Sequence, residues 1–405
     1  MLMIRTSGLS FAVAVAVAVS LALTGPASAQ APGEAKVLLD RAVELSNSGD
    51  AAGALPLAQQ ALAILEKAEG PDHPDVASTL NYLGILNQQT GRLKEAEPLY
   101  QRALSIRQKA FGAEHPQVAV SADNLAALYR TTGRRNEAEL LYKRVLVIQE
   151  NNFGPEHPAV AATASNLAAI YQETGRARDA EPFFRRALTI NEKAFGPDHP
   201  QVAASLLALG ALYRTSGRLA EAEPMLKRAI TIEERARGAE HPEIASPLLE
   251  LALVYWMQGR TDNVEPLFKR ALVIRENGYG PDHPAVAQAV NTMAGFYRDQ
   301  GRHGDAEPYF KRVLAMYEKA LGPEHPGVAT SLNNLAVLYQ EMGRPADAEP
   351  LARRALAIRE KAFGSNNPQL LNTIHNLAEL YRTLGRKAEA DALAKRADAI
   401  RQRAK

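Results

Sequence analysis

The sequence predicts an all-α solenoid of about nine antiparallel helical hairpins, and three observations predict it. The dipeptide His-Pro recurs every 42 residues, at positions 73, 115, 157, 199, 241, 283 and 325. Gly-Arg repeats with the same period from position 91 to position 385, and the apolar residues of each period follow helical spacing. The chain after position 29 is almost nine periods long. Periods of about 20–50 residues indicate stacked supersecondary units, none of which buries its apolar face alone.

Residues 1–29 have the features of a secretory signal peptide. A short positive start, Met1–Arg5, precedes the unbroken apolar run Leu9–Leu23, and Ala27-Ser28-Ala29 supplies the small residues that a signal peptidase recognises. We therefore expect cleavage before Gln30 and export to the periplasm of a bacterium or outside the cell. The alternative is a retained membrane anchor, but spanning needs about 20 apolar residues. No second run of that length follows, so we expect no membrane insertion after cleavage.

The period at residues 76–117 shows how each unit folds. A first helical stripe contains Leu80, Leu83, Gly84 and Asn87, and Gly91 ends that helix because glycine accepts a left-handed backbone. The second stripe consists of Ala96, Leu99, Tyr100, Ala103, Leu104 and Arg107. We expect a solenoid over residues 30–405, with units near 33–70, 76–112, 118–154, 160–196, 202–238, 244–280, 286–322, 328–364 and 370–403.

These spacings resemble the tetratricopeptide repeat. The matching residues are Leu125-Ala126, Tyr129, Gly133, Ala138 and Tyr142. The 42-residue period and linkers such as Gly322-Pro323-Glu324-His325-Pro326 are similar to the kinesin light chain subtype, here in an exported bacterial form. The resemblance covers about residues 34–403. It implies a right-handed superhelix whose first helices line a concave groove, and it implies protein or peptide partners without specifying which.

Composition excludes several functional classes. Lys and Arg number 47 against 45 Asp and Glu, which argues against a nucleic-acid binder. The absence of cysteine removes disulfides, thiolate catalysis and zinc–thiolate sites. We find no phosphate-binding glycine loop, no zinc-protease motif and no nucleophile elbow. We therefore expect no enzyme activity, no catalytic residues, no bound metal and no cofactor.

The repeated histidines suggest either metal binding or helix capping. Equivalent residues of stacked units lie on the order of 10 Å apart, too far to share one ion. Proline is favoured at the first position of a helix, and the residue before it is the N-cap. The eighth linker has Asn366-Asn367-Pro368, in which a strong capping residue replaces histidine. We therefore predict that the histidines are N-caps.

One row of polar side chains is predicted to face the groove, here called the Gln88 row. Residues three, four and seven apart share one side of a helix, which places this row opposite the core stripe. Arginine alternates with uncharged residues along it and offers a planar fork suited to carboxylates and peptide carbonyls. The alternative is a solvated face with no ligand. The row consists of Gln88, Arg130, Gln172, Arg214, Trp256, Arg298, Gln340 and Arg382.

A second set of polar residues, here called the asparagine row, recurs in the middle of the first helices. Asparagine is a mediocre helix former, so helix propensity does not explain it. Its amide both donates and accepts hydrogen bonds, which suits an extended peptide. The kinesin light chain resemblance also implies groove asparagines that contact bound peptides. The alternative is bonding between neighbouring units. The row consists of Asn81, Asn124, Asn166, Asn291, Asn333, Asn334 and Asn376.

The sixth unit departs most from the repeat. Its groove stripe contains Leu249, Leu253, Trp256 and Met257, including the only tryptophan of the chain. Such an apolar patch, here called the Trp256 patch, has the composition of a binding hot spot. The alternative is that Trp256 repacks into a gap left by other substitutions in this unit, among them Asn263-Val264.

The predicted function is a non-catalytic scaffold or adaptor that binds a peptide or protein segment in the groove. The alternative is a structural solenoid of the cell envelope that forms homo-oligomers.

Overall fold

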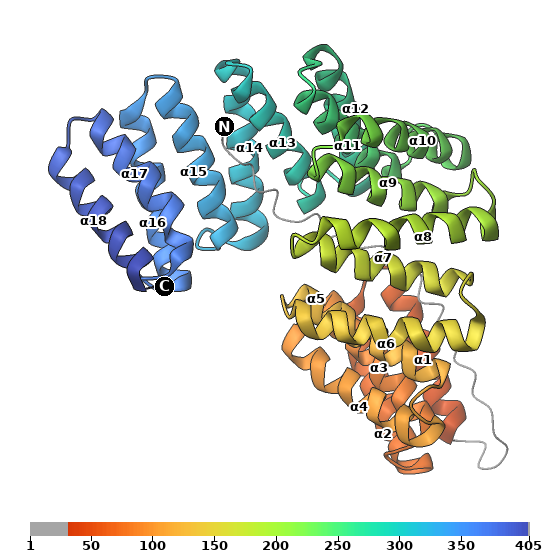
Figure 1. Cartoon of the computed structure of the whole chain (residues 1–405). Helices are drawn as coiled ribbons and strands as arrows, with labels where there is room; N and C mark the ends of the chain where they lie inside the picture. Colours follow the sequence, from red (N-terminus) through yellow and green to blue (C-terminus); the bar gives the residue numbers. More distant parts are fainter. Residues whose placement is uncertain (1–30, 404–405) are drawn as a thin grey trace. The chain divides into compact units, whose positions relative to one another are not determined.

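The computed structural model describes residues 31–403, which form eighteen α-helices, three short 3-10 segments and, over this range, no strand (Figure 1). The expected signal peptide lies outside the described residues. The chain divides into two compact units, one up to Leu212 and one from Tyr213. Between residues 31 and 403, no helix is both long enough and apolar enough to cross a membrane.

The first compact unit consists of antiparallel helical hairpins. Each pairs a first helix of about 16 residues with a second of about 19. The helices are α1 (Ala31–Asn47), α2 (Ala51–Glu69), α3 (Pro74–Gln89), α4 (Leu93–Phe111), α5 (Pro116–Thr131), α6 (Arg135–Phe153), α7 (Pro158–Glu173), α8 (Ala177–Phe195) and α9 (Pro200–Thr215), and the boundary with the second unit falls inside α9.

The second compact unit repeats this arrangement, with three short 3-10 segments added before helices. Two lie in the sixth repeat, before each of its helices, and one precedes α17. The elements are α10 (Leu219–Arg237), η1 (Pro242–Ile244), α11 (Ala245–Met257), η2 (Thr261–Asn263), α12 (Val264–Tyr279), α13 (Pro284–Asp299), α14 (His303–Leu321), α15 (Pro326–Glu341), α16 (Pro345–Phe363), η3 (Pro368–Leu370), α17 (Leu371–Thr383) and α18 (Lys387–Arg403).

The histidines of the His-Pro motif are N-caps, as predicted. The Nδ1 atom of His115 accepts a hydrogen bond from the backbone N–H of Gln117 at 3.1 Å, and its ring stacks on Phe111 with centroids 4.6 Å apart. Asn367 makes the same bond at 2.9 Å through its Oδ1 atom. The other capping histidines are His73, His157, His199, His241, His283 and His325. Across residues 31–403, no three His, Asp or Glu side chains are grouped to hold a metal.

Glycine supports the hairpin at two kinds of position. Gly91, between α3 and α4, has a φ of 75°, a left-handed conformation that costs other residues more. Gly84 lies where the two helices approach closely, because a Cβ atom there would come within 2.5 Å of the Tyr100 ring. The helices of this hairpin therefore pack at a distance that only glycine allows.

Three of the repeated motifs meet in one cluster between neighbouring units. The arginine of Gly-Arg lies over the ring of the repeated tyrosine and pairs with a glutamate of the preceding second helix. In the first compact unit, Arg134 lies 3.8 Å from the centroid of Tyr129 and 2.6 Å from Glu97. We call this arrangement the Arg–Tyr–Glu cluster. It joins a cation–π contact to an ion pair and ties a repeat to the one before it. Further clusters contain Arg176, Arg260, Arg302, Arg344 and Arg386.

A second set of arginines ties the linker ends of neighbouring units together. Arg102 on α4 donates to Glu66 at 2.6 Å and to the backbone carbonyl of Pro71 at 2.9 Å. Arg354 makes the equivalent bonds to Glu318 and Pro323 in the second compact unit. Where both kinds of contact occur, charged side chains fix both ends of a hairpin and with them the register of its first helix, which carries predicted groove residues.

Candidate functional site

Most arginines of the Gln88 row are neutralised by carboxylates of the protein itself. Arg130 donates to Glu173 of the next first helix at 2.8 Å. Arg298 pairs with Asp299 at 3.0 Å and lies 3.8 Å from Glu341. Arg382 pairs with Glu379, one turn earlier on the same helix. Each guanidinium retains exposed surface or unused donors, but a ligand carboxylate would compete with an internal one.

Arg214 is a buried ion pair and not the exposed donor that the sequence predicted. Its Nε atom donates to Glu250 at 2.6 Å, and the two residues are only 7% and 2% exposed. Glu250 stands on α11 at a position where six of the other repeats carry asparagine, alanine or threonine. The acid therefore draws the arginine into the fold. Breaking a buried pair leaves an uncompensated charge, which usually costs about 3–5 kcal/mol.

The glutamines of the Gln88 row are half-buried. Gln88 accepts from the hydroxyl of Tyr100. Gln340 lies 3.5 Å from the hydroxyl of Thr383 in the next unit. Gln172 occupies the equivalent place on α7.

The asparagine row divides into two adjacent helical positions that bond to each other across units. The amide of Asn334 donates to Asn291 at 3.3 Å, and that of Asn376 donates to Asn333 at 3.0 Å. These contacts are the alternative that the sequence left open, in which the amides link neighbouring helices. In the first compact unit, Asn81 is 5% exposed and its Oδ1 atom is buried without a partner.

The first compact unit keeps two asparagine amides available. Asn124 and Asn166 are half-buried, and neither side chain has a hydrogen-bond partner between residues 31 and 403. An amide that is reachable and unbonded can bond to a peptide backbone. These two residues are therefore the members of the row that best fit the predicted contact with a ligand.

Sequence reasoning missed Asp123, which lies beside Asn124 on α5. Burial raises the pKa of the Asp123 carboxyl to about 6. Burial, followed by the charge of Asp123, raises the pKa of the Tyr142 hydroxyl. The signal was present in the repeat, because Asp123 occupies the same position in its unit as Asn81 and Asn291 do in theirs.

The Trp256 patch is partly exposed. Met257 is 53% exposed, Trp256 and Leu253 are half-buried, and Leu249 is 9% exposed. The Trp256 ring packs edge to face on Phe296 of the next first helix, with centroids 5.6 Å apart. Trp256 therefore packs on its neighbour, while Met257 remains at the surface.

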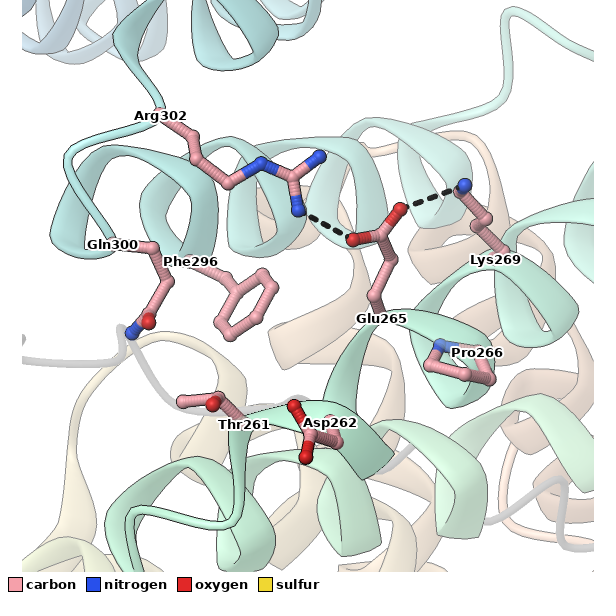
Figure 2. Close-up of a pocket in the computed structure, with 8 residues that line it drawn as sticks. All are labelled: Thr261, Asp262, Glu265, Pro266, Lys269, Phe296, Gln300 and Arg302. Atoms are coloured by element: carbon pink, nitrogen blue, oxygen red, sulfur yellow. Dashed lines mark hydrogen bonds and ion pairs between the residues drawn. The ribbon is translucent and has the colours of Figure 1, made fainter.

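A hollow of about 610 Å³ lies next to this patch in the second compact unit. Thr261, Asp262, Glu265, Pro266 and Lys269 line it from η2 and the start of α12 (Figure 2). From the next unit, Phe296, Gln300 and Arg302 complete the lining. Figure 2 shows the Phe296 ring in the middle of this group, with the pairs of Glu265 with Arg302 and Lys269 on one side of it. Sequence reasoning did not identify this hollow, because it forms between two neighbouring repeats of the second compact unit.

A family profile described as tetratricopeptide repeat matches residues 34–109, 75–151, 141–193, 159–235, 217–277, 285–361 and 347–403. No curated protein matches. A putative kinesin light chain of Podosopora anserina with nearly identical TPR-like repeats is 26% identical, covering 52% of this chain and 99% of its own, with a TM-score of 0.47.

Two further solved structures share the fold at lower sequence identity. The apo form of the quorum sensor NprR from B. thuringiensis is 15% identical, with a TM-score of 0.61, and the match covers 91% of this chain and 97% of that one. A Rap protein complexed with competence and sporulation factor is 15% identical, with a TM-score of 0.56, over 92% and 98% of the two chains. Both resemblances concern the arrangement of helices.

Proposed function

Because the chain belongs to the tetratricopeptide repeat family, we propose that it is a non-catalytic scaffold or adaptor that binds a peptide or protein segment along its first helices. The observation that carries this proposal is the Trp256 patch. Met257 is 53% exposed on α11 and stands beside the half-buried Trp256. Trp256 belongs to the Gln88 row, in which the other repeats have glutamine or arginine. Exposed apolar side chains beside an aromatic anchor have the composition of a binding hot spot.

Polar side chains on the first helices of both compact units support a polypeptide ligand. Asn124 and Asn166 offer unbonded amides, and Arg298 retains donors beside the patch. One protein of the same fold, the Rap protein, is complexed with competence and sporulation factor. The near balance of 47 basic and 45 acidic residues favours a protein or peptide over a nucleic acid.

The first test compares alanine substitutions at two apolar residues whose side chains are similarly exposed. Residues 30–405 and two variants, Met257→Ala and Val273→Ala, would be panned against a phage-displayed peptide library. Val273 is 49% exposed but lies on α12, a second helix, so it controls for the loss of exposed apolar surface. We expect enriched peptides to bind about tenfold more weakly to Met257→Ala, as for a hot-spot truncation, and unchanged to Val273→Ala.

The choice of Met257 avoids an ambiguity. Trp256 packs on Phe296, so its truncation would weaken the fold as well as any binding. A failure to enrich any peptide, or equal loss in both variants, would contradict binding along the first helices. If the wild-type protein instead forms oligomers whose size rises with concentration in sedimentation equilibrium, the structural homo-oligomer becomes the better interpretation.

We also propose that the protein is exported to the periplasm or beyond. This proposal rests on the sequence of residues 1–29, with its positive start, apolar run and small residues before Gln30. Expression of the full chain in a bacterium, followed by mass determination of the product in the periplasmic fraction, tests it. A product that begins at Gln30 is expected, and an uncleaved chain in the cytoplasm would contradict export.

A further inference from the structure

The hollow beside Phe296 contains one carboxylate that the described chain does not neutralise. Of the two acids in its lining, Glu265 accepts from both cations, Lys269 at 2.7 Å and Arg302 at 2.6 Å. Asp262 has no ion-pair or hydrogen-bond partner for its side chain among residues 31–403. The local arrangement therefore leaves a negative charge at the mouth of the hollow, beside Phe296 and Pro266 (Figure 2).

Comparison with the other units shows that the repeat does not require this carboxylate. In a typical unit the acid stands one residue later and pairs with the arginine of the turn, as Glu137 does with Arg134 at 2.9 Å. In the sixth unit that place is taken by Asn263, and the acid has moved to Asp262. The residues equivalent to Asp262 are Lys94, Asn136, Arg178, Ala220, Gly304 and Ala346, none of them acidic.

Phe296 departs from the repeat at the same place. It is 2% exposed and closes the bottom of the hollow, where it contacts Trp256 and Phe268. In the other repeats from the second to the ninth its equivalents are all aliphatic, namely Leu86, Leu128, Ile170, Leu212, Val254, Leu338 and Leu380. Stacking of the units thus requires neither the aromatic ring nor the free acid, yet both line the same hollow.

We propose that this hollow is a second binding site, which takes a lysine or arginine side chain of a partner polypeptide. The methylene stem of such a side chain packs on Pro266 and the edge of Phe296, while its cation pairs with Asp262. Thr261 and Gln300, also in the lining, offer oxygens for the remaining donors. The site is separate from the Gln88 row and does not depend on a ligand there.

The single tryptophan of the chain provides a direct reporter. The ring of Trp256 packs edge to face on Phe296, which lines the hollow, with ring centroids 5.6 Å apart. In a ¹⁵N-labelled sample of residues 30–405 it gives one indole N–H resonance. We expect that resonance to shift in a saturable way when Nα-acetyl-lysine methylamide is added, and to remain still with the norleucine analogue, which has a similar stem and no charge.

Variants at one position test the role of the free acid. Asp262→Asn and Asp262→Ala should each weaken binding of the lysine probe by up to about fivefold, the upper end for loss of one exposed ion pair. Alanine stands at the equivalent positions 220 and 346, so the second variant is compatible with the fold. Glu240→Gln removes an acid from the linker end of the same unit and should leave binding unchanged.

The outcomes separate the hollow from nonspecific attraction and from the groove. No saturable shift, an equal shift with the norleucine probe, or equal affinity in Asp262→Asn would overturn the proposal. A parallel loss in Glu240→Gln would also overturn it, because it would show that general charge attracts the probe. Peptide binding that depends on Met257 is measured separately, so either site can fail while the other stands.

Discussion

At the scale of single residues, equivalent positions of different units act as substitutions of one another. The position of Asp123 carries asparagine at 81, 291 and 333. Asparagine therefore fits this place in the helix without steric change. What differs is the charge, and burial of that charge raises the pKa of Asp123 to about 6, against an ordinary value of 3.8.

We predict that Asp123→Asn stabilises the protein at neutral pH and not in acid. Because the pKa is higher in the folded state, the folded chain holds more protons between about pH 4 and 6, so the stability of the wild type falls as pH rises through this range. The variant lacks this loss and should be more stable by roughly 1–3 kcal/mol at pH 7. Urea unfolding of both proteins at pH 4 and pH 7 measures the difference. An unchanged difference at the two pH values would show that the carboxyl is not desolvated.

The same scale shows what the sequence can and cannot predict about side chains. The histidine caps were predicted because a cap bonds to a backbone N–H two residues away, within one short segment. The partner of Asn334 lies 43 residues earlier on the preceding repeat, and that of Arg130 lies 43 residues later on the next one. Those contacts depend on how two helices are aligned, which the residue types alone do not specify. Likewise, the sequence does not show that the carboxylate of Asp262 lacks a partner, because this depends on how two repeats pack around the hollow.

At the scale of elements, the start of each first helix is determined by its linker. The His-Pro pair places a capping acceptor before a residue that already lacks an N–H, so few donors remain unsatisfied there. The 42-residue spacing of this motif makes the helix starts the most predictable feature of the chain. The 3-10 segments were not predicted, because short turns at helix ends follow from local packing.

The caps allow a prediction at one helix, α9. His199 accepts from the backbone N–H of Gln201 at 3.1 Å and stacks on Phe195. His199→Asn keeps the acceptor, as Asn367 shows, and should change the free energy of unfolding by only a few tenths of a kcal/mol. His199→Ala removes the acceptor and should cost about 1 kcal/mol.

Thermal or urea unfolding of the three proteins, with and without chelator, measures these effects. The difference in free energy of unfolding between the asparagine and alanine variants measures the contribution of the cap. The difference between the wild type and the asparagine variant measures that of the ring stack. A large loss in His199→Asn, or any loss of stability on adding chelator to the wild type, would contradict the capping role.

At the scale of the whole molecule, stability depends on the contacts between successive units, because each unit meets only its neighbours. The Arg–Tyr–Glu clusters contribute one charged contact to each of six of these interfaces, two in the first compact unit and four in the second. In the first compact unit, hydrogen bonds from Arg176 and then from Lys143 lower the pKa of Glu139 to about 2. In the second, Lys269 and Arg302 lower that of Glu265 to about 2.

These lowered values predict acid unfolding in a defined range. A carboxyl whose pKa is lower when folded than when unfolded stabilises the protein above its unfolded pKa, near 4.5, and that stability is lost as pH falls toward 2. Several interfaces lose a contact in the same range, so unfolding should be cooperative. Helical circular dichroism against pH would follow it.

Glu139→Gln tests whether one cluster accounts for part of this loss. The side chain of Glu139 is 13% exposed, but its partner Arg176 is 38% exposed, so solvent screening limits the pair to about 1 kcal/mol. We expect the variant to be less stable by that amount at pH 7 and to approach the wild type as pH falls to 2 and below, where Glu139 becomes protonated in both states. Because the interface joins two repeats, its weakening should also broaden the unfolding transition at pH 7. A deficit that persists unchanged to pH 2 would mean that the glutamate contributes through packing and not through its charge.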